Sequence, residues 1–252
     1  MSPVISDWLD DLLAAAAFLT RMPVPHRASP PNLARAYRAF PALGAAIGAA
    51  IGAVYLLLLW IELPAIAAAP LALGVGAMIT GALHEDGLAD LADGFGGGRG
   101  QAAKLELMRD SRLGTFGALA LMTSFVAKVG ALSALPRSEV LLAMIATHAL
   151  ARAPLAVLAA AMRYARPDGL AASAGRPESG IALTACVLAV VIVFVTLPAG
   201  TAMIAAFVTA VVATSLAALA QRQIGGQTGD VLGAVEQVCE VAVLLTLAAR
   251  LG

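Results

Sequence analysis

Long apolar runs alternate with short polar connections along this chain. Three of the runs contain no charged residue, and they cover residues 39–61, 63–83 and 179–221. A helix that crosses a bilayer needs about 20 mostly apolar residues. The first two runs have that length, and the third is long enough for two helices. The pattern therefore predicts membrane-spanning helices.

Turn residues divide the apolar sequence into seven predicted spans. Pro198-Ala-Gly-Thr201 splits the longest run and Glu62-Leu-Pro64 separates the first two, as proline and glycine do between helices. The spans cover residues 40–60, 64–83, 114–135, 140–162, 181–197, 202–220 and 231–249. The last contains Glu236 and Glu240, and if it does not cross, the C-terminus stays on the side of the N-terminus.

A shorter apolar run occupies residues 12–19. It follows Asp7, Asp10 and Asp11, at a place where a secretory signal would carry Lys or Arg. This run predicts an amphipathic helix in the membrane interface, ended by Arg21-Met-Pro-Val-Pro25.

Composition supports a membrane protein. Hydrophobic residues make up 60% of the 252 residues and charged residues 13%, whereas soluble domains carry about 25% charged residues. Lipid contact over much of the surface explains this deficit. The predicted fold class is all-α, a polytopic helical bundle in which residues 1–252 form one domain.

The net charge is zero and no basic-aromatic stripe is present, so nucleic acid is not an expected partner.

The short connections set the predicted orientation. One side of the membrane receives the basic residues Arg21, Arg27, Arg35, Arg38, Arg99, Lys104, Arg109, Arg112, Arg163, Arg166, Arg176 and Arg222. The other side receives only Arg137 and Arg250. This asymmetry predicts that the N-terminus is cytoplasmic. It also places three polar clusters, residues 84–117, 163–180 and 225–230, on one membrane face.

An acidic segment follows the second predicted span. In His84-Glu-Asp-Gly-Leu-Ala-Asp-Leu-Ala-Asp-Gly94, the residues Asp86, Asp90 and Asp93 are spaced four and then three apart. On a helix they share one face, where their charges repel unless a cation lies among them. Oxygen ligands of this kind suit magnesium. The predicted Mg²⁺ ligands are these three aspartates, with Glu85 at the same end but off that face.

A glycine run, Gly94-Phe-Gly-Gly-Gly98, comes next. Glycines let backbone amides approach a phosphate closely, which makes Gly94 and Gly97 candidate substrate contacts. A flexible connector explains the same composition, so both interpretations stay open.

The connection then brings Arg109, Asp110, Ser111 and Arg112 before the third span. The arginines are candidates for clamping phosphates, and Asp110 for completing a metal shell or acting as a base. Anchoring on the positive side of the membrane is the alternative role for the arginines.

A third cluster, Gly225-Gly-Gln-Thr-Gly-Asp230, opens the seventh span. Asp230 occupies a natural helix-capping position and needs no further role. Gln227 and Thr228, which lie between glycines, are more typical of a turn that contacts a ligand.

Five ionisable residues fall inside predicted spans: Lys128, His148, Arg152, Glu236 and Glu240. Charges in a membrane are costly and are usually paired. Structural ion pairs between helices are the favoured interpretation, and a proton or ion path is the alternative.

Glycines are regularly spaced in the first predicted span. Gly44, Gly48 and Gly52 repeat at every fourth position of the first span. Such spacing makes a smooth helix face and predicts close packing against another helix.

These motifs together resemble the cobalamin synthase family, the adenosylcobinamide-GDP ribazoletransferases. The matching segments occur in the family's order and run almost from end to end. They are residues 18–25, 40–44, 84–94, 108–117 and 225–234.

The resemblance implies an inner-membrane, magnesium-dependent enzyme with a cytoplasmic site. It would join adenosylcobinamide-GDP to α-ribazole or its 5′-phosphate and release GMP. The candidate catalytic residues are Asp86, Asp90, Asp93, Asp110 and Arg112. The candidate substrate-binding residues are His84, Gly94, Gly97, Arg109, Ser111, Gln227, Thr228 and Asp230. A homo-oligomer and complexes with other corrinoid-pathway enzymes stay open.

Two rival interpretations stand beside this one. CDP-alcohol phosphotransferases also place spaced aspartates at a membrane face, but their pattern has an Ala-Arg pair where Ala89 is followed here by Asp90. A transporter would use the intramembrane charges, yet its site normally lies near the midplane, whereas the dense carboxylates here lie at one end.

Overall fold

The computed structural model describes residues 3–25 and 32–252, and all regular elements in these ranges are helices. They are α1 (Pro3–Leu19), α2 (Leu33–Ala36), the 3₁₀ turn η1 (Tyr37–Ala39), α3 (Phe40–Trp60), α4 (Ala65–Thr80), α5 (Leu83–Gly97), α6 (Gln101–Leu107), α7 (Thr115–Ala134), α8 (Arg137–Ala161), α9 (Leu170–Ala174), α10 (Ser179–Thr196), α11 (Ala199–Ile224) and α12 (Gly229–Leu251). The predicted all-α membrane bundle is confirmed.

The predicted spans agree closely with the helices. Six helical segments are long and apolar enough to cross a membrane, whereas α4 passes the same test only when it is taken together with α5, which bends away from it. Helix α3 has the predicted bounds, 40–60, and α12 is a continuous helix of 23 residues despite Glu236 and Glu240. The seventh predicted span therefore has the length and the apolar character of a membrane-crossing helix.

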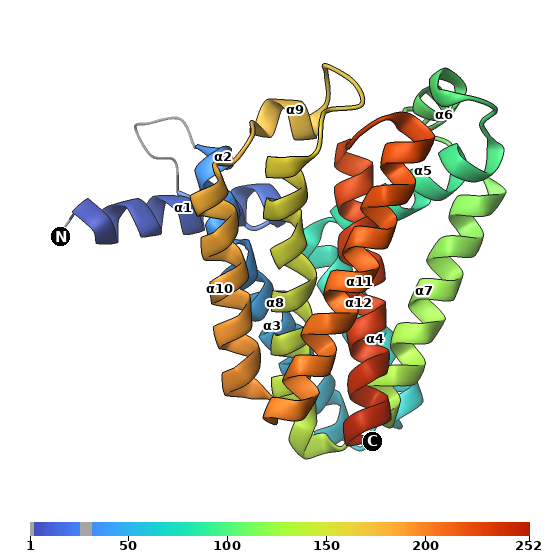
Figure 1. Cartoon of the computed structure of the whole chain (residues 1–252). Helices are drawn as coiled ribbons and strands as arrows, with labels where there is room; N and C mark the ends of the chain where they lie inside the picture. The colour runs from blue at the N-terminus through green and yellow to red at the C-terminus, as the bar shows by residue number, and fades with distance from the viewer. Residues whose placement is uncertain (1–2, 26–31) are drawn as a thin grey trace.

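The second span differs from its prediction. Its apolar run continues to Leu83, but α4 ends at Thr80, and α5 leaves at 93° to it. Gly81 and Ala82 both have left-handed backbone conformations, with φ of 68° and 56°. Glycine adopts this conformation freely and alanine does not, so the corner depends on the surrounding packing. As a result, α5 lies crosswise near one end of the bundle rather than continuing the span (Figure 1).

The connections predicted to be cytoplasmic do gather at one end. Figure 1 shows α1, α2, α6 and α9 at the upper end of the bundle and the C-terminus at the lower end. Helix α1 lies across this end, as expected for an interfacial helix, and it begins earlier than the predicted residue 12. The three polar clusters therefore share one end of the molecule.

Helices α8 and α12 form the interior of the bundle, and α3 packs tightly on α8. A methyl group at Gly44 would lie 2.3 Å from the carbonyl oxygen of His148, and one at Gly48 would lie 2.2 Å from that of Met144. The glycine repeat therefore serves close packing, as predicted. On the outside, large apolar side chains such as Val195 and Met78 are 79% and 77% exposed, which suits contact with lipid.

Candidate active site

The site is built where α5 crosses α12. A methyl group at Gly87 would lie 3.0 Å from the carbonyl oxygen of Asp230, and one at Gly233 would lie 3.3 Å from the Cα of Gly87. Only glycines permit backbones to approach this closely. The crossing brings Asp86, beside Gly87 in sequence, to the first turn of α12. Both Asp86 and Asp230 line the pocket formed there.

Asp90 belongs to the same acidic group. It lies one turn after Asp86 on α5 and is half-buried. Burial raises the pKa of Asp90 to about 7, and the nearby charges of Asp86, Asp230 and Asp93 add to this increase while Arg166 opposes it. The contributions of the three neighbouring aspartates to the raised pKa show that negative charge is crowded at this place.

Arg166 also belongs to the site, although its position in the sequence predicted only a basic connection and not a site residue. Its Nη2 lies 3.1 Å from Oδ2 of Asp230, and both side chains are mostly buried. The hydroxyl of Thr228 also donates to that oxygen over 3.1 Å. Arg166 belongs to the 163–180 connection, which has no distinctive spacing, so only the fold shows that it meets Asp230.

Asp93 has a different environment from its predicted partners. Its two carboxylate oxygens accept hydrogen bonds from the backbone amides of Gly114 and Gly117, at 2.8 and 2.9 Å. These amides open α7, where an anion is stabilised by the helix dipole. Asp93 therefore joins α5 to the start of α7, and its oxygens are engaged.

Glu85 lies apart from the other acidic side chains. It lines a cavity inside the bundle together with Lys128 and Glu240, whereas Asp86 lines a different pocket, with Asp230. The structure does not bring Glu85 to the predicted metal ligands.

The glycine run is helical as far as Gly97, which contradicts its interpretation as a flexible connector. Helix α5 continues to Gly97, and its amides bond within the helix. A methyl group at Gly94 would lie 2.5 Å from Cγ of Met108, and one at Gly97 would lie 3.3 Å from Cδ1 of Leu107. These glycines let α6 pack against the end of α5.

The arginines of the next connection are exposed and paired. Arg109 Nη2 lies 2.5 Å from Asp168, and Arg112 Nη2 lies 2.6 Å from Asp110. Hydrogen bonds from Arg112 hold the pKa of Asp110 at about 2, well below its usual range. Ser111 is exposed between them. All of these residues lie at the end of the bundle that carries the acidic group.

Gln227 and Thr228 are buried parts of the turn before α12. The backbone of Gln227 exchanges hydrogen bonds with Arg163 and Ala165, both at 2.8 Å. The hydroxyl of Thr228 caps α12 by accepting from the amide of Val231 over 3.2 Å. Their contacts fix the turn that presents Asp230, and the side-chain oxygen of Gln227 is buried without a partner.

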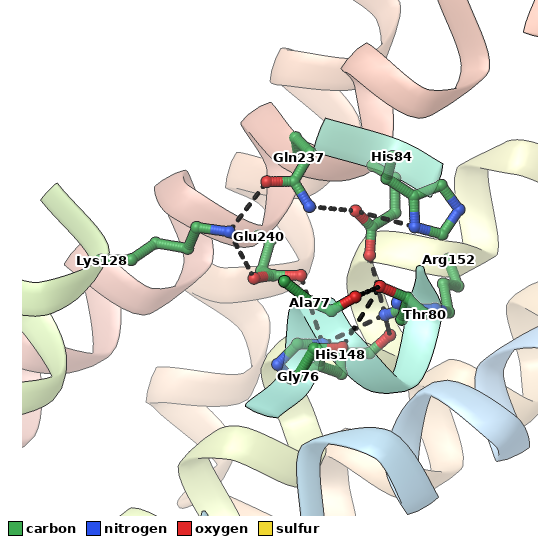
Figure 2. Close-up of polar contacts among 10 residues, drawn as sticks. Gly76, Ala77, Thr80, His84, Lys128, His148, Arg152, Gln237 and Glu240 are labelled. Atoms are coloured by element: carbon green, nitrogen blue, oxygen red, sulfur yellow. Dashed lines mark hydrogen bonds and ion pairs between the residues drawn. The ribbon is translucent and has the colours of Figure 1, made fainter. Parts of the chain in front are cut away.

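His84 connects the site to a network of buried charges inside the bundle (Figure 2). Its Nδ1 lies 3.4 Å from Glu236, which also contacts Arg152 at 2.8 Å. Glu240 contacts Lys128 at 3.0 Å and His148 at 3.2 Å. These residues come from α5, α7, α8 and α12, so the predicted ion pairs between helices are confirmed.

Among the described residues, one set of three side chains has donor atoms close enough to hold a metal ion: His148, Glu236 and Glu240. Arg152 and Lys128 already lie against these carboxylates and balance their charge. A further cation would be repelled, so the geometry favours structural pairing.

The acidic group at the α5–α12 crossing does not bring three donor atoms this close together in the described residues, but its residue types and its unbalanced charge suit magnesium. Asp86 and Asp90 offer oxygens on one face of α5, and Asp230 faces them from α12. Magnesium usually takes one or two carboxylates and fills its remaining positions with water and substrate phosphates. The donor set and the crowded negative charge fit such an ion, with Arg166 as the nearby cation.

The fold defines a multi-pass membrane protein, and the site gathers carboxylates and arginines at one end of its bundle. A family model, cobalamin-5-phosphate synthase, matches residues 11–248. The chain belongs to this family. This membership decides against the CDP-alcohol phosphotransferase and transporter interpretations.

Curated relatives cover nearly the whole chain. Proteins named adenosylcobinamide-GDP ribazoletransferase are 44% identical in Bradyrhizobium diazoefficiens and 43% identical in Sinorhizobium medicae, each over 97% of this chain and over 95% and 98% of their own length. The protein of the same name from Azorhizobium caulinodans is 42% identical over 94% of both chains. No solved structure matches.

Proposed function

We propose that this protein is an adenosylcobinamide-GDP ribazoletransferase. It joins adenosylcobinamide-GDP to α-ribazole or its 5′-phosphate and releases GMP. The observation that carries the proposal is the meeting of Asp86 and Asp230 at one pocket, with Asp90 one turn further along α5 and close enough to feel both charges. The relatives of that name match nearly the whole chain.

Magnesium is the proposed cofactor. Asp86 and Asp90 would hold it, and the ion would supply charge neutralisation at the pyrophosphate. Arg166 keeps Asp230 in place through their ion pair. Arg109 and Arg112, which lie at the same end, are proposed to meet the phosphates of the GDP moiety when these displace their present partners, Asp168 and Asp110.

The reaction is a phosphoryl-group displacement. A ribazole hydroxyl oxygen forms a bond to the phosphorus attached to cobinamide, and the bond from that phosphorus to the GMP oxygen breaks. The hydroxyl proton passes to a carboxylate. Asp93 and Asp110 are poorly suited to accept it, because the oxygens of Asp93 accept two amide bonds and Arg112 holds Asp110 ionised.

The proposed location is the bacterial inner membrane with the site on the cytoplasmic side. The positive-inside rule supports this location, since the basic connections lie at the end of the bundle that carries the acidic group.

The direct test uses the purified protein in lipid nanodiscs. GMP release should require adenosylcobinamide-GDP, ribazole and Mg²⁺ together, and EDTA should abolish it until Mg²⁺ is restored. Absence of GMP release with both substrates present would overturn the proposal, and release that survives EDTA would overturn the role of magnesium.

A further inference from the structure

The pocket beside the acidic group has an apolar wall that the proposed phosphate chemistry does not use. Its lining includes Phe18, Tyr37, Phe40, Leu83, Leu155 and Leu232. These side chains come from α1, η1, α3, α5, α8 and α12, so most of the fold contributes to it.

Aromatic rings form one side of this pocket. The rings of Phe18 and Phe40 are stacked with their centroids 6.1 Å apart, and the rings of Tyr37 and Phe40 lie 4.6 Å apart. Tyr37 and Phe40 are each 2% exposed, so their positions are set by packing. A rigid aromatic wall favours a flat ring system over a flexible chain.

The polar edge of the pocket is the acidic group itself. Asp86 and Asp230 line the same cavity, together with the backbone of Gly87 and Gly229. A ligand whose ring lies against the aromatic wall would therefore hold its attached sugar or phosphate beside the carboxylates.

The two substrates offer four ring systems for this place: the corrin ring, the adenine of the adenosyl ligand, guanine and the base of α-ribazole. The corrin ring is too large and carries many amides. Guanine and adenine are flat, but their edges present several donors and acceptors, and each one left unpaired against leucine or phenylalanine would weaken binding. The base of α-ribazole, dimethylbenzimidazole, is flat and mostly apolar, and its two methyl groups match an apolar lining.

We infer that this pocket, bounded by Phe18, Tyr37, Phe40 and Leu83, binds the dimethylbenzimidazole base of the acceptor. The base lies on the aromatic wall and the ribose points toward Asp86 and Asp230. This inference rests on the proposed function and assigns one substrate to one side of its site.

The test changes the shape of the pocket and compares two acceptors. Leu83→Phe fills space and Phe40→Leu removes ring area. Kinetics are measured with α-ribazole and with the benzimidazole ribonucleoside that lacks both methyl groups. In Leu83→Phe the ratio of kcat/KM for the two acceptors should move at least about tenfold toward the smaller base. In Phe40→Leu the KM for ribazole should rise about tenfold while the KM for adenosylcobinamide-GDP stays within twofold.

Tyr55→Leu is the matched control for Phe40→Leu. Tyr55 lies on the same helix and is also buried, at 1% exposure, but it lies in the other half of α3 and does not line the pocket. It removes a similar amount of core packing, so its acceptor ratio and its KM for ribazole should not change.

The outcomes separate this inference from the proposed function. Unchanged acceptor ratios in Leu83→Phe, or a larger rise in KM for the corrinoid than for ribazole in Phe40→Leu, would overturn the base site. Equilibrium binding of ribazole, followed without adenosylcobinamide-GDP, tests the pocket even if transfer fails: weaker binding in Leu83→Phe than in wild type supports the inference, and equal binding contradicts it. Loss of transfer in the wild type would refute only the proposed function.

Discussion

Two groups of charged side chains lie close together in this protein and differ in how they are neutralised. In the interior of the bundle, Glu236 has Arg152 at 2.8 Å and Glu240 has Lys128 at 3.0 Å. Each buried carboxylate thus has its own fixed cation. At the α5–α12 crossing, Asp86, Asp90 and Asp230 share one close cation, Arg166.

This difference in neutralisation indicates a structural role for the interior group and a ligand-binding role for the group at the α5–α12 crossing. Paired charges in a low-dielectric interior hold helices together, because removing either partner leaves the other uncompensated. A group with excess negative charge is destabilised until a cation or a cationic ligand arrives. Spacing alone does not distinguish the two groups, since Asp86 and Asp90, like Glu236 and Glu240, are four residues apart.

The largest expected effect is on the acidic group. Asp86→Asn and Asp90→Asn should each lower kcat for GMP release by about 10³-fold, because each removes a proposed metal ligand while the side-chain volume stays the same. The rate and its dependence on Mg²⁺ are measured in lipid. Near-normal turnover by both variants, with the metal dependence unchanged, would refute the metal site.

Asp93→Asn is the matched comparison on the same helix. Its oxygens already accept bonds from the amides of Gly114 and Gly117, so its loss should lower stability and leave the Mg²⁺ dependence as in wild type. A shift in Mg²⁺ dependence as large as that of Asp90→Asn would place Asp93 among the ligands.

Substitutions in the buried network of charges should change the stability of the fold rather than the rate of the reaction. Lys128→Met leaves Glu240 without its cation and should destabilise the fold by about 3–5 kcal/mol. Thermal unfolding in nanodiscs measures this effect. Lys128→Met combined with Glu240→Met should recover part of the loss, whereas a double variant no more stable than the single one would show that the pair is not the cause.

Magnesium affinity should depend on pH. The pKa of Asp90 is raised to about 7, so this carboxyl is protonated below that pH and becomes a full ligand above it. Because the metal binds the ionised form, the apparent affinity for Mg²⁺ should rise between pH 6 and pH 8. Titration of activity against Mg²⁺ at several pH values measures this rise, and Asp90→Asn should flatten it. An equal rise in Asp90→Asn would assign the effect to another group.

The smallest effect on stability is expected at Arg109. Its pair with Asp168 is exposed, so Arg109→Ala should change stability by less than about 1 kcal/mol. If Arg109 meets substrate phosphate, the KM for adenosylcobinamide-GDP rises in Arg109→Ala and not in Asp168→Ala. Equal behaviour of the two variants would leave Arg109 as a membrane anchor only.

The three aspartates Asp86, Asp90 and Asp93 show what residue spacing can predict about a site and what it cannot. Helical spacing correctly places Asp86 and Asp90 one turn apart, because the α-helical period is a local property. It does not reveal that the amides of α7 engage Asp93 or that Glu85 faces the interior with Lys128. Those environments depend on helices that are neighbours only after folding.

The sequence by itself determined the membrane spans, the shared end of the polar clusters and the family, because apolar runs, basic connections and motifs are properties of contiguous residues. Only the tertiary structure decided the corner at Gly81 and Ala82, the meeting of Asp86 with Asp230, and the partner of Arg166. These features come from segments up to about 140 residues apart, which the close contact of Gly87 and Gly233 brings together. The close backbone approach of α5 and α12 at that contact, rather than any local pattern, makes the site.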